Sequence, residues 1–152
     1  MGCELLSDVL EHSQPPDLRG FGGSTDERAE HVDPSIDDYA EDVIGLIREV
    51  AHGPVVLCGL SMGGYASLAV MRRAPQLVRA LILADTRATA DTLEGRARRK
   101  AMLTVLEHDG PQGVAREMMP NLVGASTKVS NPGVEETLRL LIKRQSPAAI
   151  RD

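Results

Sequence analysis

Two apolar runs stand out from the polar background of this chain. Residues 54–59 (PVVLCG) and 78–84 (VRALILA) lack polar alternation, which is typical of strands buried on both faces of a sheet. Between them, residues 63–74 read as a helix that Pro75 stops. A strand, a helix and a second strand in this order predict two parallel strands joined by a right-handed crossover.

A further helix is expected ahead of the first strand. Ser35 is a good N-cap, and Asp38 three residues later completes a pattern that resembles a capping box. The helix over residues 36–51 should bury one face, made of Ile36, Tyr39, Val43, Ile47 and Val50. Residues 1–16 read as a short amphipathic helix ending at two prolines, and residues 17–34 read as a loop.

The pattern after the second strand is helical throughout. Helices are expected over residues 92–108, 112–119 and about 132–145. The residues expected to bound them are Asp91 and Asn131 as N-caps, Pro132 at a first helical position, and Gly110-Pro111 and Pro120 as stops. The apolar face expected for the first of these helices is Leu93, Ala97, Ala101 and Val105.

The composition describes a globular chain with an aliphatic core. Of the 152 residues, 42% are hydrophobic and 2% are aromatic, and the net charge is −5. The acidic balance argues against nucleic acid or an anionic membrane surface as a partner, and no apolar run approaches the ~18 residues of a membrane span. Cys58 is expected to be a buried free thiol, and two cysteines make no disulfide framework, which favours a reducing cytoplasm.

The turn between the first strand and its helix carries the pattern G-x-S-x-G, with Ser61 at its centre. A serine on such a turn projects its hydroxyl above the sheet in a strained conformation, as a nucleophile does. The N–H of Met62, at the start of the helix, would donate to a developing oxyanion. The turn is expected to fit so tightly against neighbouring backbone that positions 59 and 63 have no room for a side chain, which explains Gly59 and Gly63. The alternative is a glycine-rich turn with a solvated serine.

These motifs resemble those of the α/β-hydrolases. GLSMGG at residues 59–64 is similar to the elbow of their serine esterases and lactonases, and DLRGFGGS at 17–24 resembles their "D-x-R-G-x-G-x-S" loop. DYAEDV at 38–43 and LILADTRA at 81–88 resemble the segments before and after the nucleophile strand. Together they look most like the enol-lactonase and small carboxylesterase branch.

The resemblance implies a partial α/β-hydrolase fold. Residues 17–90 would form the core portion, a parallel strand–helix–strand unit with its nucleophile elbow. Residues 91–152 would form a helical cap or lid, and residues 1–16 are an atypical N-terminal segment. Because an early strand with its His-Gly loop and a late strand are not evident, the chain is expected to be cut at both ends.

The family's triad also requires a late histidine and an acid. His108 is the one histidine after Ser61, but it ends a predicted helix, where a cation suits the helix dipole. Asp85 ends the second strand, from where some members supply the acid, although capping the loop explains it equally. The histidines that precede the serine and fit no family position are His12, His31 and His52.

Other chemistry is less favoured. Residues 20–25 do not complete a dinucleotide loop, and the acidic residues near 37–38 are explained by a helix start, so no cofactor or metal is expected. A basic patch on the helix over 92–108 is a solvated face or, in a lid, an attractor for a substrate carboxylate; it consists of Arg96, Arg98, Arg99 and Lys100.

Two functional hypotheses follow. One is a serine-type hydrolase that cleaves a small carboxylic ester or lactone through an acyl-enzyme on Ser61, with Met62 as oxyanion donor. The other is a truncated, catalytically inactive fragment or interaction module. A homo-oligomer is left open by the sequence.

Overall fold

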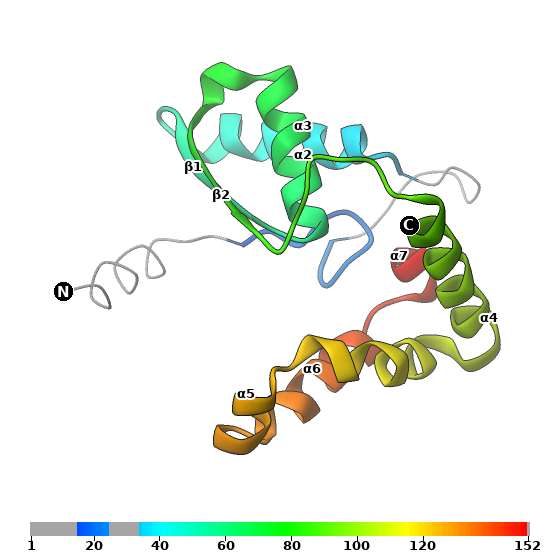
Figure 1. The fold of residues 1–152 in the computed structure, drawn as a ribbon. Coiled ribbons are helices and arrows are strands. Elements are labelled where there is room, and N and C mark those ends of the chain that lie inside the picture. The colour runs from blue at the N-terminus through cyan, green and yellow to red at the C-terminus, as the bar shows by residue number, and fades with distance from the viewer. Residues whose placement is uncertain (1–14, 25–33, 152) are drawn as a thin grey trace.

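The computed structural model describes residues 15–24 and 34–151. The helix predicted over residues 1–16 therefore lies almost wholly outside the described residues, as do His12 and His31. The described chain has a part built on a small sheet and a part built only of helices, with the loop of residues 15–24 between them (Figure 1).

The sheet consists of two parallel strands, as predicted. Strand β1 (Val55–Leu60) pairs with β2 (Val78–Ala84), and the register runs from Val56 opposite Ala80 to Leu60 opposite Ala84. Helix α3 (Met62–Arg73) and a short 3-10 turn (Pro75–Leu77) form the crossover between them. Because β1 continues to Leu60 and α3 begins at Met62, Ser61 is the single residue between a strand and a helix.

Helix α2 (Ile36–Val50) begins with the predicted capping box, in which the Ser35 side chain accepts from the Asp38 N–H and the Asp38 carboxylate accepts from Ser35. The buried face differs slightly from the prediction. Val50 is 52% exposed, so its expected burial was wrong. The buried side chains of α2 are Tyr39, Ala40, Ile44 and Ile47. They face α3, because the side chains that pack against them include Ala69 and Val70.

The prediction that both strands are buried on both faces was wrong. Val55 and Leu57 of β1 pack against the core formed with α2 and α3. Val56 is 52% exposed and Ile82 46% exposed, and Cys58 is exposed rather than buried. The physical reason is that α2 and α3 pack on one face, whereas no described element covers the other. Strand β1 therefore presents alternate side chains to solvent, whereas β2 exposes the neighbouring residues Ile82 and Leu83 together.

Helix α4 (Leu93–Leu122) contains the break predicted near residue 110. Gly110 has φ 66° and ψ −167°, which is not helical, and Pro111 begins the second half. Pro120 lies within the helix and does not end it as predicted. The fixed φ of proline is close to the helical value, and its missing N–H removes only one hydrogen bond of the helix. The N-cap is Thr92, whose hydroxyl accepts from the Gly95 N–H, and not Asp91 as predicted.

The buried face of α4 also differs from the prediction. Leu93 is 86% exposed, whereas Leu106 is 4% exposed. Residues 99, 102, 103 and 106 follow the i, i+3, i+4, i+7 spacing of the inner face. The predicted stripe depended on two alanines, and the larger Met102, Leu103 and Leu106 decide which side packs inward.

Three shorter helices complete the described chain. Helix α6 (Gly133–Lys143) matches the last predicted helix, but Pro132 occupies the N-cap position and the Asn131 carbonyl accepts from the Val134 N–H at 3.1 Å. Helices α5 (Ala125–Ser130) and α7 (Pro147–Arg151) were not predicted. Helices α6 and α7 both contact α4, so the helical part has its own packing.

Candidate active site

Ser61 lies on a strained turn at the end of β1. Its backbone has φ 51° and ψ −114°, a conformation that L-residues rarely adopt. Three hydrogen bonds hold it there: the Ser61 N–H donates to the Ala84 carbonyl at 2.9 Å, and the Ser61 carbonyl accepts from the Gly64 N–H and the Thr86 hydroxyl, each at 2.9 Å. The side chain is exposed. The turn therefore presents a serine hydroxyl at the carboxyl end of the sheet.

Close packing explains two of the glycines around Ser61. A Cβ on Gly59 would lie 2.5 Å from the Gly63 carbonyl oxygen, and one on Gly64 would lie 2.5 Å from the Thr86 side chain. A Cβ on Gly63 would meet nothing within 4 Å among the described residues. The prediction for Gly59 is confirmed and that for Gly63 was wrong, because it is Gly64 that faces the loop after β2.

Met62 is the first residue of α3, so its N–H has no acceptor within the helix. It follows Ser61 directly, at the positive end of the helix dipole. The first turn of α3 contains no acidic residue to oppose that field. This is the geometry in which a backbone donor stabilises negative charge beside the serine.

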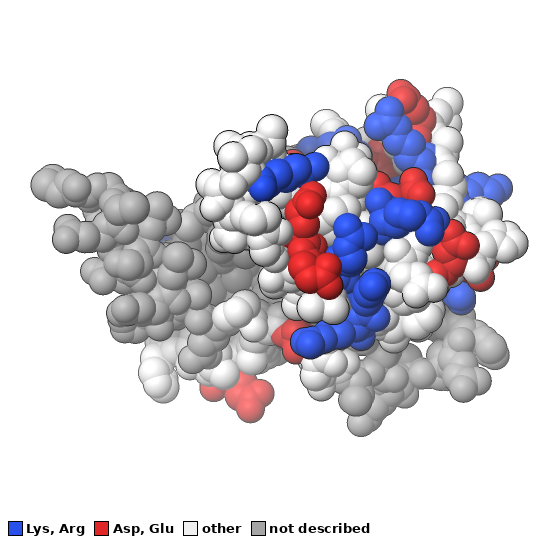
Figure 2. All heavy atoms as spheres, turned by 90° about the horizontal axis from the view of Figure 1, so that it is seen from below, with Lys and Arg blue, Asp and Glu red and all other residues white. Residues whose placement is uncertain are grey.

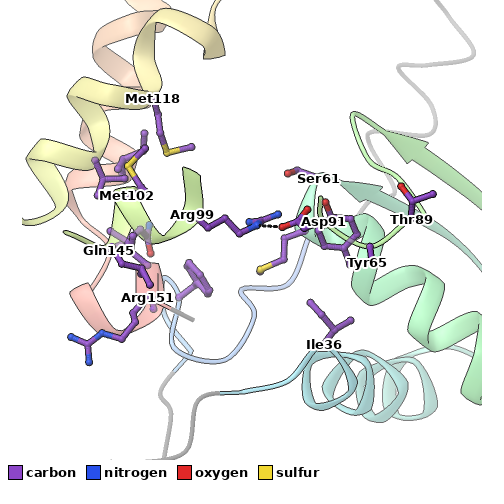
Figure 3. Close-up of a pocket in the computed structure, with 18 residues that line it drawn as sticks. Ile36, Ser61, Tyr65, Thr89, Asp91, Arg99, Met102, Met118, Gln145 and Arg151 are labelled. Carbon is purple, nitrogen blue, oxygen red and sulfur yellow. Dashed lines mark hydrogen bonds and ion pairs between the residues drawn. The ribbon is translucent and has the colours of Figure 1, made fainter. Parts of the chain in front are cut away.

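Ser61 and Met62 open onto a cavity of about 760 Å³ between the sheet-bearing part and the helical part (Figure 3). Its volume is in the range of small-molecule sites. The far wall is mostly apolar and comes from α4, α6 and α7. The apolar side chains lining the cavity include Phe21, Ile36, Met102, Leu103, Val114, Met118, Ile142 and Ile150.

The loop of residues 15–24 supplies Phe21 to the lining of the cavity. The Asp17 carboxylate accepts from the Gly23 N–H at 2.8 Å, and the Ser24 hydroxyl donates to the Asp17 carbonyl at 2.7 Å. The Arg19 guanidinium pairs with Asp42 of α2 through two of its nitrogens. This loop is thus closed on itself and tied to α2, which fixes one side of the cavity.

A charged cluster stands at the edge of the same cavity. The Arg99 Nε–H donates to the Asp91 carboxylate at 2.5 Å (Figure 3). Arg87 pairs with the other oxygen of the same carboxylate. The hydrogen bonds from Arg99 and Arg87 hold the pKa of Asp91 below its ordinary value. The bond to Asp91, together with the nearby Tyr65 phenol, raises the pKa of Arg99. Of the predicted basic patch, Arg99 alone lines the cavity.

Neither described histidine joins Ser61 in the cavity. His108 and His52 are exposed, and neither is among the residues that line it. Asp85 directly follows Ala84, the hydrogen-bond partner of Ser61, and has a φ of 43°, but it does not line the cavity. The structure therefore brings Ser61 and Met62 together and leaves His108 apart from them.

Within the described ranges, no group of three or more His, Cys, Asp or Glu side chains could hold a metal ion, and no helix is long and apolar enough to cross a membrane. The face shown in Figure 2 carries Lys and Arg side chains interspersed with Asp and Glu. That face is not a continuous basic surface of the kind that binds nucleic acid.

Comparison with known proteins agrees with the fold. The model of the alpha/beta hydrolase family matches residues 10–148 of this chain. The chain therefore belongs to the alpha/beta hydrolase family, and the described residues form part of its fold, with the elbow turn at Ser61 and a helical segment after β2.

The solved structures that this chain resembles include an esterase and an enol-lactonase. A thermophilic esterase from Thermogutta terrifontis, solved with malate bound, is 36% identical with a TM-score of 0.79, over 90% of this chain and 49% of that one. An enol-lactonase from Burkholderia xenovorans shares the fold, at 23% identity and a TM-score of 0.73, over 88% of this chain and 49% of that one. The 2-(acetamidomethylene)succinate hydrolase of Mesorhizobium japonicum is 42% identical over 48 residues, 32% of this chain and 17% of that protein.

The chain thus spans about half the length of the solved structures that it matches.

Proposed function

We propose that this chain carries the nucleophile of a serine-type hydrolase that cleaves a small carboxylic ester or lactone. The observation that supports this most is the position of Ser61, held at φ 51° between β1 and α3 with its side chain on the cavity. Strain at an exposed polar residue costs about 1–3 kcal/mol and persists where function requires it.

The proposed reaction proceeds through an acyl-enzyme. The Ser61 Oγ forms a bond to the substrate carbonyl carbon, and the Met62 N–H stabilises the negative charge on the carbonyl oxygen. The alcohol then leaves with the proton of the serine hydroxyl. Water cleaves the acyl bond, releases the acid and restores the serine. The reaction needs neither a metal nor a cofactor, and the scarcity of cysteine favours the cytoplasm as its compartment.

The division of labour between the two parts follows from the cavity. Residues 17–90 would carry the nucleophile, and residues 91–152 would act as a cap whose apolar side chains hold the acyl group. Met102 and Met118 line the cavity opposite Ser61, and flexible thioethers suit acyl groups of different shape. We propose that Phe21, from the loop before α2, closes the third side.

A second candidate is a member of the family that binds small molecules or partners without turnover. Its support is that neither His52 nor His108 lines the cavity, so no histidine from the described residues faces Ser61 to act as its general base. A serine hydroxyl without a base is a poor nucleophile.

Labelling with a fluorophosphonate probe, together with p-nitrophenyl acetate hydrolysis, separates these candidates. The hydrolase proposal predicts labelling and turnover that Ser61→Ala abolishes. Ser67→Ala is the matched control, because that hydroxyl donates to the Gly63 carbonyl at 2.8 Å and does not line the cavity. Absence of both labelling and serine-dependent turnover would favour the binding protein. If turnover is present, His108→Ala should leave it unchanged, since His108 does not line the cavity.

A further inference from the structure

The charge on the cavity wall is opposite in sign to that of the whole protein. The chain has a net charge of −5, yet the charged residues that line the cavity are Arg99, Arg151 and one acid, Asp91. In Figure 3 the Arg151 guanidinium points away from Ser61, whereas Arg99 extends across the cavity toward Asp91, Tyr65 and Ser61. Arg99 is therefore the cation on the side of the proposed nucleophile.

Asp91 does not neutralise this cation fully. Its carboxylate binds Arg99 through one oxygen and Arg87 through the other, so two positive charges share one negative charge. Asp91 has 18% of its side chain exposed, against 62% for Arg99, so the guanidinium is the accessible member of the pair. The three side chains together carry one net positive charge, and Arg99 is the one of the two cations that lines the cavity.

The geometry of Arg99 suits a second anion. Its Nε–H is the donor to Asp91, and Tyr65 also interacts with the guanidinium, which has five N–H donors in all, so several donors remain. A planar fork of this kind binds a carboxylate through two parallel hydrogen bonds. Tyr65 also lines the cavity, four residues after Ser61 and so near it on α3. The rest of the wall is mostly apolar and offers no competing charge of this sign near Ser61.

We propose that Arg99 binds a free carboxylate on the substrate, so that the site prefers an ester or lactone bearing a carboxylate over its neutral counterpart. This inference rests on the proposed function for the identity of the reacting group, but binding of the carboxylate does not require turnover. The competing explanation is that Arg99 is a structural partner of Asp91 only, as Arg87 is.

Ligand binding to the full chain carrying Ser61→Ala tests the proposal without chemistry. Two probes of equal shape are compared by amide chemical-shift titration: glutaric acid monomethyl ester, which is an anion, and methyl glutaramate, its neutral carboxamide. We expect the anion to bind at least about tenfold more tightly, the size expected for a charge-assisted bidentate hydrogen bond. We also expect the preference to weaken in about 0.5 M salt, because salt screens exposed charges.

Arg98 provides a matched control beside Arg99. It is on the same helix with 78% of its side chain exposed, pairs with Glu94 and does not line the cavity. Arg99→Gln should remove the preference for the anion, Arg98→Gln should retain it, and Arg99→Lys should retain only part of it, because an ammonium lacks the planar fork. Equal affinity for the two probes, or the same loss in both glutamine variants, overturns the proposal. Far-UV circular dichroism confirms that each variant is folded.

A kinetic comparison keeps this inference separable from the proposed function. With mono-p-nitrophenyl glutarate and its neutral carboxamide as substrates, the wild-type kcat/KM should favour the anion by a similar factor, and Arg99→Gln should remove the difference. If Ser61 is labelled by the fluorophosphonate but the anionic and neutral probes bind with equal affinity, the carboxylate site is refuted and the hydrolase proposal stands. If the anionic probe binds more tightly but neither labelling nor turnover is observed, the hydrolase proposal is refuted and the carboxylate site stands.

Discussion

The Thr86 hydroxyl donates a hydrogen bond of 2.9 Å to the Ser61 carbonyl, which ties the loop after β2 to the turn after β1. The turn is thus held from the neighbouring strand as well as by its own helix. We expect Thr86→Val, which keeps the shape and removes the hydroxyl, to destabilise the protein by about 1 kcal/mol and to slow labelling of Ser61. Thr86→Ser is the control, and urea unfolding with labelling kinetics measures both. Equal effects of the two variants would contradict a role for the hydroxyl.

The strain at Ser61 predicts that glycine stabilises the fold there. Ser61 has φ 51° and ψ −114°, where the Cβ is unfavourable. Ser61→Gly removes this cost of about 1–3 kcal/mol, less about 0.5–1 kcal/mol for the greater freedom of glycine in the unfolded chain. We expect a gain of about 1 kcal/mol in urea unfolding and complete loss of labelling. Ser61→Ala keeps the Cβ, so a gain of the same size in that variant would refute the strain argument.

The three glycines of the turn should respond differently to alanine. At Gly64 a Cβ would lie 2.5 Å from Thr86, so Gly64→Ala is expected to cost about 1–3 kcal/mol, as overpacking does. Gly59→Ala should cost at least as much, because it would meet backbone atoms that cannot move aside. Gly63→Ala is the control and should be neutral or stabilising by about 0.5 kcal/mol, since α3 then has one fewer glycine. Thermal or urea unfolding of the three variants measures this order. A Gly63→Ala variant destabilised as much as the other two would contradict it.

The Arg19–Asp42 pair should stabilise the loop that carries Phe21. Only 21% of the Arg19 side chain and 38% of the Asp42 side chain are exposed, and Arg19 also donates to the Asp38 carbonyl at 3.2 Å. A double-mutant cycle with alanine at both positions is expected to give a coupling of about 1 kcal/mol. The pair Arg98–Glu94, both more than 70% exposed, is the comparison and should give about 0.3 kcal/mol. Equal couplings would show that the loop gains nothing from its pair.

The free energy of unfolding at acidic pH should depend on Asp91. Its pKa is lowered from 3.8 by hydrogen bonds from Arg99 and Arg87, so the carboxylate contributes stability above its unfolded pKa and loses that contribution as the pH falls through the folded value. The difference in unfolding free energy between wild type and Asp91→Asn should therefore be constant from about pH 8 to about pH 5 and shrink below about pH 4. Urea titrations at a series of pH values measure it. In a background that carries both Arg87→Gln and Arg99→Gln, the same free-energy difference should no longer decrease at acidic pH. If the decrease is still observed in that background, groups other than these two arginines cause it.

Short-range patterns predicted the elements around the site well. The capping box at Ser35, the elbow at Ser61 and the break at Gly110 each depend on a few consecutive residues, and all three have the expected geometry. The packing of these elements was harder to predict. Gly63 and Gly64 are adjacent in sequence, and only the position of Thr86 distinguishes them. Asp91 has the residue type of an N-cap, but Arg87 four residues before it and Arg99 eight residues after it occupy its carboxylate.

By itself the sequence determined the family, the parallel strand–helix–strand unit and the serine at its turn, because alternation, caps and turn glycines act over a few residues. The tertiary structure alone decided that one face of the sheet is exposed and that His108 lies away from Ser61. It also decided that Arg99, one of the four residues of the predicted basic patch, reaches the cavity. Which side of a helix or sheet is covered depends on its neighbours in space, and local periodicity does not contain that information.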